Sequence, residues 1–352
     1  TRLMTEDYGN PSSTHSFGRN AKSVLELARK SIAKQLNVVG SEIFFTSSGT
    51  EANNWILRSA VRDLGVKRII TTKIEHHAVL YPALALQKEF GIQVDFVAIL
   101  PDGNIDVTHL AELLSQEVTT LVSLMHVNNE VGVVLDLERI AIICKEHNAL
   151  FHSDTVQSVG KTEIDLKALP IDFISASAHK FHGPKGIGFA FIRKNSGLQP
   201  LLLGGEQEKG MRGGTESVYQ IAGMAKALEM AYANLDSERA CISDLKEYCA
   251  NQLAQRFPNS KIVGSKNNFY NIINVVLPLS ADKTGMLLFH LDMKGIAVSR
   301  GSACQSGSSN PSHVLAEILS PEELVQPSLR ISLSHYNTKE EIDYLIEVLA
   351  TV

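Results

Sequence analysis

Hydrophobic and polar residues follow two regular patterns over the first part of the chain. Residues 21–36 (AKSVLELARKSIAKQL) place apolar side chains three and four positions apart, which predicts an amphipathic helix. Short apolar runs then alternate with stretches of helical spacing. The runs predict strands at residues 42–47, 67–72, 93–100, 119–126 and 149–154, and the stretches between them predict helices at 50–64, 78–90, 106–116 and 137–148.

This alternation predicts an α/β fold, because nearly continuous apolar strands joined by helices form a mostly parallel sheet that is covered on both faces. After about residue 235 the pattern changes to a long charged helix, several short apolar runs and a final helix at 338–352. We therefore expect a large α/β domain at residues 1–236 and a smaller α+β domain at residues 237–352.

Composition and charge exclude several classes of protein. The chain has a net charge of -5, whereas binding to nucleic-acid phosphates needs an excess of basic residues, so a nucleic-acid-binding protein is not predicted. No apolar stretch reaches the ~20 residues that would span a bilayer. The four cysteines form no C-x-x-C pair, so neither a disulfide framework nor a zinc site is predicted, and we expect a reducing, cytoplasmic compartment.

Polar residues with chemical potential follow the predicted strands. Gly49 and Thr50 follow the first strand and open a helix, where free backbone N–H groups bind anions, although Ser48-x-x-Glu51 also fits a simple capping box. His76 and His77 follow the second strand; being adjacent they diverge, so that one of them could face a cleft. Ligands of such sheets gather at the carboxyl ends of the strands.

Three later strand ends add further groups. Asn128 and Asn129 could be turn residues or ligand donors. Asp154 ends an apolar strand and needs a cationic or N–H partner, unless it only caps the next helix. Lys180 lies between two apolar runs in FISASAHKFHGPKGIGFAFI, and lysine is the side chain that forms imines with aldehydes. An amine, a carboxylate and an anion site together match the needs of pyridoxal phosphate.

Several long motifs, in order and over essentially the whole chain, resemble the cysteine desulfurases. They are SSGTEANN, EHHAVL, HVNNEVGVV, HSDTVQSVGK, SASAHKFHGPKGIG, MRGGTES and VSRGSACQSGSSNPSHVL. The resemblance implies a class V aminotransferase-like enzyme of fold type I, with a long cysteine loop as in the iron–sulfur-assembly group. Two departures stand out: the family's N-terminal segment with a DNAATT-like stretch is missing here, and Glu206 replaces a usual glycine.

The resemblance also assigns roles to individual residues. It makes Lys180 the imine-forming lysine, Asp154 the partner of the pyridine nitrogen, and His76 the ring that stacks on the cofactor. Lys161 and Lys185 would then be solvated or structural. The remaining implied ligands are Gln157 on the ring hydroxyl, Gly49, Thr50, Ser177 and His179 around the phosphate, Thr215 on the phosphate of a neighbouring subunit in a homodimer, and Asn129 with Arg330 on the substrate carboxylate.

Cys304 lies in a run of glycine, serine and alanine that is typical of a flexible linker, so composition alone leaves it as a tolerated surface thiol or a reactive one. Cys144, Cys241 and Cys249 are expected to pack inside the protein. The resemblance selects Cys304 as the nucleophile that takes sulfur from L-cysteine, leaves L-alanine and passes its persulfide to acceptor proteins for iron–sulfur clusters or thiolation. His76 could act as its base, and we infer that the charge of Arg300 helps.

The sequence leaves two other classes of function open, a different enzyme on the same scaffold and a non-catalytic protein. A selenocysteine lyase or a small-amino-acid aminotransferase could use the same scaffold, although an aminotransferase needs no thiol such as Cys304. A non-catalytic scaffold subunit is also possible, although it would not need Lys180, Asp154 and Cys304 together.

Overall fold

A computed structural model describes residues 2–265, 267–301 and 312–352. Its main feature is a seven-stranded sheet in the order β1-β7-β6-β5-β4-β2-β3. The strands are β1 (Ile43–Thr46), β2 (Arg68–Thr71), β3 (Gln93–Phe96), β4 (Thr120–Ser123), β5 (Leu150–Asp154), β6 (Phe173–Ser177) and β7 (Gly188–Ile192). Only β7 runs antiparallel to its neighbours, so the predicted mostly parallel α/β sheet is confirmed.

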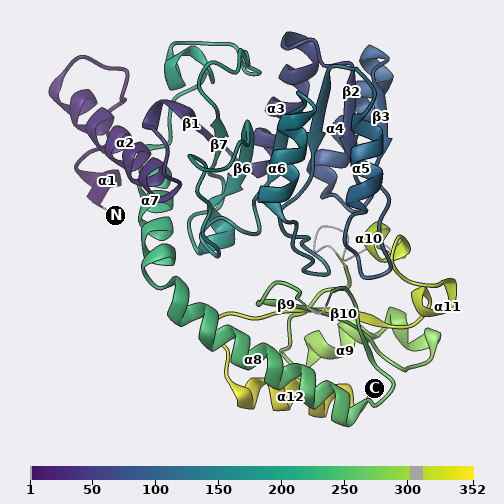
Figure 1. Ribbon diagram of the computed structural model, residues 1–352. Coiled ribbons are helices and arrows are strands. Elements are labelled where there is room, and N and C mark those ends of the chain that lie inside the picture. The colour runs from purple at the N-terminus through teal and green to yellow at the C-terminus, as the bar shows by residue number, and fades with distance from the viewer. Residues whose placement is uncertain (1, 266, 302–311) are drawn as a thin grey trace.

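Helices cover both faces of this sheet (Figure 1). They are α2 (Ser16–Gln35), α3 (Gly49–Asp63), α4 (His77–Phe90), α5 (Val107–Leu114), α6 (Leu137–Glu146) and α7 (Val218–Ala233), after a short α1 (Arg2–Thr5). Successive strand residues point to opposite faces, so Phe44 packs with α3 and α4 while Phe45 packs with α2 and α7. Burial on both faces explains why these strands read as continuous apolar runs.

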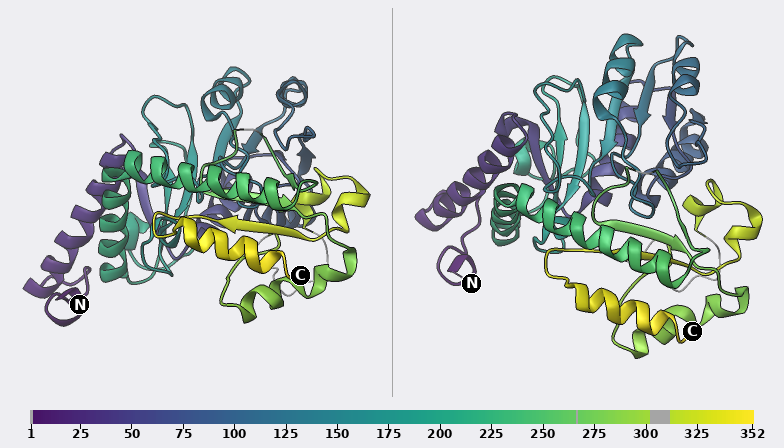
Figure 2. Two further views of the ribbon diagram at one scale, coloured as in Figure 1. Left: turned by 90° about the horizontal axis from the view of Figure 1, so that it is seen from below. Right: turned by 60° about the horizontal axis from the view of Figure 1, so that its bottom comes forward.

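A three-stranded antiparallel sheet forms the second part of the fold, in the order β10-β9-β8. Its strands are β8 (Lys261–Ile262), β9 (Ile272–Val276) and β10 (Ser328–Ser332). The long helix α8 (Leu235–Arg256) and the last helix α12 (Lys339–Leu349) lie side by side (Figures 1 and 2), and with α9 (Leu287–Met293) they form one apolar core with this sheet. The two-residue strand β8 was too short to be predicted from its pattern.

Two predicted strands are shorter than expected, at β3 and β4. The assigned strand β4 ends at Ser123, but the chain beyond it still contacts β5, since the N–H groups of Leu124 and His126 donate to the carbonyls of His152 and Asp154 at 3.1 and 3.0 Å. Between them, Met125 donates its N–H to the buried carboxylate of Glu75 at 2.8 Å. The run therefore stays beside the sheet although its last three residues are not assigned to the strand.

Glu206, which replaces a usual glycine, fits its loop without backbone strain. The φ of Glu206 is -77°. The left-handed residues of this loop come two and three positions later, at Glu208 (φ 48°) and Lys209 (φ 60°). Glu208 is held by a buried, bidentate ion pair with Arg29 at 2.8 Å for both contacts. The Glu208–Arg29 pair therefore anchors this loop, and the backbone at position 206 does not adopt the left-handed conformation that favours glycine.

Candidate active site

A cleft of about 200 Å³ opens at the carboxyl ends of the large sheet's strands. Its walls come from the segments after β1, β2, β4, β5 and β6, and from β10 of the small sheet. The lining residues are Ser48, Gly49, Thr50, Asn53, His76, Ala78, Met125, Asn129, Asp154, Val156, Gln157, Ser177, His179, Lys180 and Arg330. The predicted convergence of strand ends on one cleft is therefore present in the structure.

Lys180 is presented to the cleft by a sharp turn after β6. The turn is a short 3-10 helix (Ala178–Phe181) that ends at His182, whose φ is 62°. Within the turn, the Nδ1 atom of His179 lies 3.0 Å from the Ser177 hydroxyl. Burial lowers the pKa of His179, and the charge of Lys180 lowers it further, so a neutral imidazole is favoured beside the amine.

Asp154 lies at the end of β5, and both of its carboxylate oxygens accept hydrogen bonds from the protein. Asn53 donates to Oδ2 at 2.7 Å, and the backbone N–H of Val156 donates to Oδ1 at 3.0 Å. These two donors hold in place a carboxylate that is 5% exposed. Asn53 was missed by sequence reasoning, because a polar residue inside a helix carries no local signal of a partner 101 positions away.

The N-terminus of α3 forms another wall of the cleft. Ser48 caps the helix by accepting a hydrogen bond from the Glu51 N–H at 3.2 Å, as the capping interpretation predicted. Glu51, however, accepts from the N–H of Ser47 at 2.8 Å and pairs with Arg212, so the reciprocal half of the box differs. A Cβ atom on Gly49 would lie 2.5 Å from Val156, so this close approach requires glycine.

The two adjacent histidines diverge as expected. His76 faces the cleft and caps α4, with its Nδ1 accepting from the Ala78 N–H at 3.1 Å. A neutral His76 ring therefore carries its proton on Nε2. His77 points elsewhere and stacks between Tyr81 and His313, at 4.4 Å between ring centroids in each case.

The two asparagines after β4 differ: one is a turn residue and the other lines the cleft. Asn128 is a turn residue, since its Oδ1 accepts from the N–H groups of Glu130 and Val131 at 2.9 and 3.0 Å. Asn129 lines the cleft, and its backbone oxygen accepts a 2.9 Å hydrogen bond from Arg330. Arg330 thus reaches from β10 to the large sheet and places a guanidinium in the cleft.

Some predicted site residues lie away from this cleft or outside the described chain. Thr215 is exposed and does not line the cleft, and Cys304 falls within residues 302–311, outside the described residues. Cys144 and Cys249 are buried, and burial raises the pKa of each thiol to about 12. The prediction that Cys241 is packed inside was wrong, because this residue is exposed.

The other two lysines near the site differ in their surroundings. Lys185 is exposed, as a solvated residue should be. Lys161 is not simply solvated: burial lowers its pKa to about 8, and the charge of Lys180 lowers it further. Among the described residues, the side chains of His, Cys, Asp and Glu form no group of three that could hold a metal ion.

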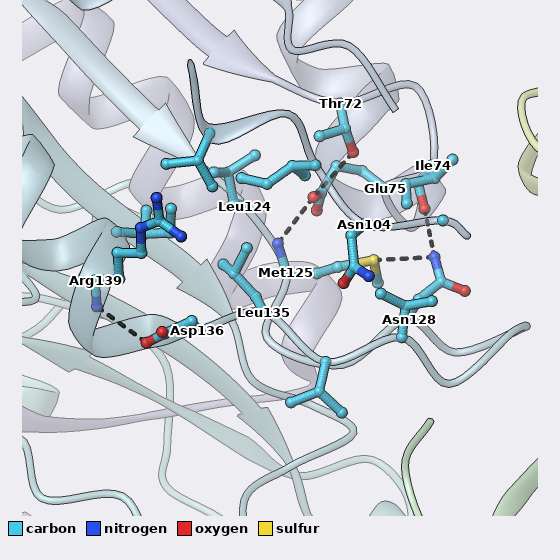
Figure 3. A pocket seen from close by; sticks show the side chains of 16 residues that line it. Thr72, Ile74, Glu75, Asn104, Leu124, Met125, Asn128, Leu135, Asp136 and Arg139 are labelled. Atoms are coloured by element: carbon cyan, nitrogen blue, oxygen red, sulfur yellow. Dashed lines mark hydrogen bonds between the residues drawn. The ribbon is translucent and has the colours of Figure 1, made fainter. Parts of the chain in front are cut away.

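Figure 3 shows a second cavity, of about 230 Å³. Met125 lines both this cavity and the cleft. Glu75 lines this cavity and is 1% exposed. Its Oε1 accepts from the Met125 N–H at 2.8 Å and the Thr72 hydroxyl at 3.4 Å. Burial raises the pKa of Glu75 to about 8, and the charge of Asp154 adds to the rise.

Glu75→Gln is expected to flatten the pH dependence of stability. The folded pKa of Glu75 lies above its ordinary value near 4.5, so between pH ~5 and ~8 the unfolded chain loses a proton that the folded chain keeps. Stability therefore falls as pH rises through this window, by up to a few kcal/mol. Thermal unfolding of Glu75→Gln and the parent from pH ~5 to ~8 measures the effect, with the exposed Glu117→Gln as the control. Parallel curves of stability against pH for Glu75→Gln and the parent would contradict the prediction.

Comparison with known proteins defines the class first. The family model for class-V aminotransferases matches residues 1–345, so the chain belongs to that family, whose members use pyridoxal phosphate. The fold agrees: a solved structure described as a NifS-like protein superposes with a TM-score of 0.90 at 37% identity, covering 99% of this chain and 93% of that one.

Within this family the chain belongs to the cysteine desulfurases. It is 42% identical to a cysteine desulfurase IscS of Clostridium botulinum, over 99% of this chain and 88% of the relative. It is also 40% identical to the cysteine desulfurase IscS of Dictyoglomus turgidum, over 99% of this chain and 89% of the relative. The family resemblance inferred from the motifs is therefore confirmed. Within the described residues, no helix has the length and apolar character needed to cross a membrane.

Proposed function

We propose that the chain binds pyridoxal phosphate in the cleft and removes sulfur from L-cysteine, giving L-alanine and a persulfide on Cys304. The observation that carries this proposal is the meeting of Lys180, Asp154 and the N-terminus of α3 in one cleft. These groups fit the cofactor: an amine for its aldehyde, a carboxylate for its ring nitrogen and backbone N–H groups for its phosphate.

The cleft supports the fit at two further points. Asp154 is fixed by donors on both oxygens, so it is held ready to keep a proton on the ring nitrogen. Because glycine has no Cβ, the start of α3 at Gly49 can pack closely against Val156. The same part of the cleft is lined by Thr50, Ser177 and His179. Gln157 lines the same cleft, where an amide can donate to the ring hydroxyl.

Pyridoxal phosphate supplies an aldehyde that condenses with amines and a ring that accepts electrons. In our proposal Lys180 would be the amine that holds this aldehyde and would also carry the substrate's α-proton. His76 would lie against the ring, but a role as base would require its Nδ1 to release the Ala78 N–H. Arg330 and Asn129 hold the substrate carboxylate at the cleft wall.

In this proposal, Cys304 then takes the sulfur atom from the substrate. Its thiolate forms an S–S bond to the substrate sulfur while the substrate C–S bond breaks. The electron pair of that bond stays with the carbon skeleton, which takes up protons and leaves as alanine. The sulfur is thereby oxidised to the persulfide level and the carbon is reduced, so no outside oxidant is needed.

The proposal has three further parts: the sulfur acceptor, the oligomeric state and the domain boundary. The persulfide is passed to acceptor proteins, either an iron–sulfur scaffold or a thiolation enzyme, in the cytoplasm. The chain acts as a homodimer, and exposed Thr215 serves the cofactor phosphate of the neighbouring subunit. The boundary between large and small domains near residue 236 also stays a prediction.

The test is to incubate purified protein with L-cysteine and measure alanine and sulfide in the presence of a reductant. Equal amounts of both products support the desulfurase. Release from selenocysteine but not cysteine would favour a lyase, and transfer of the amino group to a keto acid would favour an aminotransferase. A colourless protein with no turnover would favour a scaffold subunit.

Arg330→Ala is expected to lower kcat/KM for L-cysteine by a factor that corresponds to ~2–4 kcal/mol of transition-state stabilisation. Most of the loss should appear as a higher KM, because a charge-assisted contact to the substrate carboxylate is lost. Arg330→Lys keeps the charge but not the planar fork and should fall between the two. Steady-state kinetics check both, with the exposed Arg256→Ala as control. An unchanged kcat/KM in Arg330→Ala would limit Arg330 to holding Asn129.

A further inference from the structure

Glu75 is a buried carboxyl group that the proposed reaction does not use. It lines the second cavity, whereas the next residue, His76, lines the catalytic cleft. The Oε1 atom of Glu75 already accepts from Met125 and Thr72, but Oε2 has no hydrogen-bond partner within the described chain. A buried polar atom without a partner is destabilising, so Oε2 indicates that a partner from outside the chain belongs here.

The protonation of Glu75 decides what kind of partner this is. Burial raises the pKa of Glu75 to about 8, so the carboxyl group is mostly neutral at neutral pH. A neutral acid carries a single proton, and Oε1 already accepts hydrogen bonds from two donors. The proton is therefore expected on Oε2, which makes this oxygen a donor that needs an acceptor.

The second cavity has room for a molecule that supplies this acceptor. Its volume of about 230 Å³ exceeds that of the ~150 Å³ apolar cavity that holds benzene in another protein. Figure 3 shows the Glu75 carboxyl group between Thr72 and Met125 at this cavity. Most of the wall is apolar, as in typical small-molecule sites, and includes Ile74, Ile105, Val107, Val133, Leu135 and Ile140.

The cavity is also accessible from the protein surface. Asp136 and Arg139, at the N-terminal end of α6, line the cavity and are exposed to solvent. Met125 is the one residue that lines both the cavity and the catalytic cleft within the described ranges. A small molecule can therefore reach Glu75 without passing through the catalytic cleft.

The charges near Glu75 favour an uncharged ligand. The negative charge of Asp154 is close enough to raise the pKa of Glu75, so it would also repel an anion placed beside Glu75. A cation would gain an ion pair only if Glu75 lost its proton, and removing two charges from water has a large desolvation penalty. A neutral molecule avoids both costs.

We propose that this cavity is a second binding site, for a small uncharged molecule with an apolar body and one acceptor oxygen that bonds to Glu75. The ligand class is an alcohol, ester or amide of about 6–10 non-hydrogen atoms, given the volume of the cavity. The site lies apart from the catalytic cleft, and the inference does not depend on the reaction proposed above.

The test uses benzyl alcohol as the probe and ethylbenzene as its partner of nearly equal shape, which lacks the oxygen. Saturation-transfer NMR on the purified full chain measures both dissociation constants. We expect benzyl alcohol to bind the parent with a dissociation constant on the order of 1 mM, as for a good ligand of this size.

Two variants locate the probe. Leu135→Phe adds bulk to the wall of the second cavity and should weaken binding of both probes about 10-fold or more. Arg330→Ala changes the wall of the catalytic cleft instead, and should leave both dissociation constants within about twofold of the parent.

Two further variants test the hydrogen bond to Glu75. Glu75→Gln keeps an acceptor for the Met125 N–H and places an amide donor where Oε2 was, so it should retain the parent's preference between the probes. Glu75→Leu removes the donor, and should weaken benzyl alcohol relative to ethylbenzene about 3- to 10-fold, the size expected for one hydrogen bond. The ratio within one variant is unaffected by a general loss of stability.

The inference is overturned if benzyl alcohol shows no saturable binding to the parent, or if Glu75→Leu leaves the ratio of the two probes unchanged. It is also overturned if Leu135→Phe binds both probes as the parent does, or if Arg330→Ala weakens them equally, since the probes would then lie elsewhere. Should Glu75→Leu fail to fold, Leu135→Phe and Arg330→Ala still decide, because neither changes a hydrogen-bond partner of Glu75.

Discussion

Replacing Cys304 by alanine should lower sulfur release from L-cysteine by several orders of magnitude while the protein still binds cofactor and substrate. None of the cofactor contacts that we assign involves Cys304, so the steps before sulfur transfer should proceed. What is lost is a thiolate held near its target, and effective molarities of such groups reach ~10⁵–10⁸ M. Sulfide assays and mass spectrometry after a cysteine pulse without reductant measure the loss.

The structure supplies matched controls for this experiment. Cys241 is exposed, so Cys241→Ala tests whether any accessible thiol can serve. Cys144 and Cys249 are buried with pKa values near 12, which leaves almost no thiolate at neutral pH. All three alanine variants should keep near-normal turnover. Added sulfur on one of these cysteines, or full activity in Cys304→Ala, would refute the assignment.

Lys180→Ala should remove the covalent link between protein and cofactor and abolish turnover. The amine is presented by the turn after β6, and the other lysines of this region differ in position: Lys185 is exposed and Lys161 does not line the cleft. Borohydride reduction followed by peptide mapping should find the cofactor on Lys180 in the parent and on no lysine in the variant.

Lys185→Ala is the control for Lys180, because it removes a nearby cation without touching the cleft. It should keep both the covalent link and most of the activity. A cofactor mapped to Lys161 in the parent would move the assignment, since the pKa of Lys161 near 8 leaves an appreciable fraction of that amine unprotonated.

Sequence patterns predicted the large sheet well because its strands are buried on both faces. Residues 188–192 are apolar at every position and residues 173–177 contain only small or apolar side chains, and the charged or polar residues that follow them mark where each strand ends. Since parallel strands end at one edge, Asp154 and Lys180 could be placed together without knowing any contact.

Partners distant in the chain could not be predicted in the same way. Asn53 and Glu130 look like ordinary polar residues of a helix and a turn, and only the folded chain shows that they face Asp154 and Ser312. Cys241 was misplaced for a simpler reason. Eight residues separate it from Cys249, and at about 100° per residue the two side chains point roughly 80° apart on the helix.

The groups that we assign to pyridoxal phosphate and those that we assign to the substrate come from different parts of the fold. Lys180, Asp154 and the start of α3 lie at the edge of the large sheet, whereas the guanidinium of Arg330 arrives on β10 of the small sheet. Closing the long stretch of chain between these segments costs entropy, which the contacts between the two sheets must offset. In our proposal, a change that loosens the small sheet from the large one therefore weakens substrate selection more than it weakens cofactor binding.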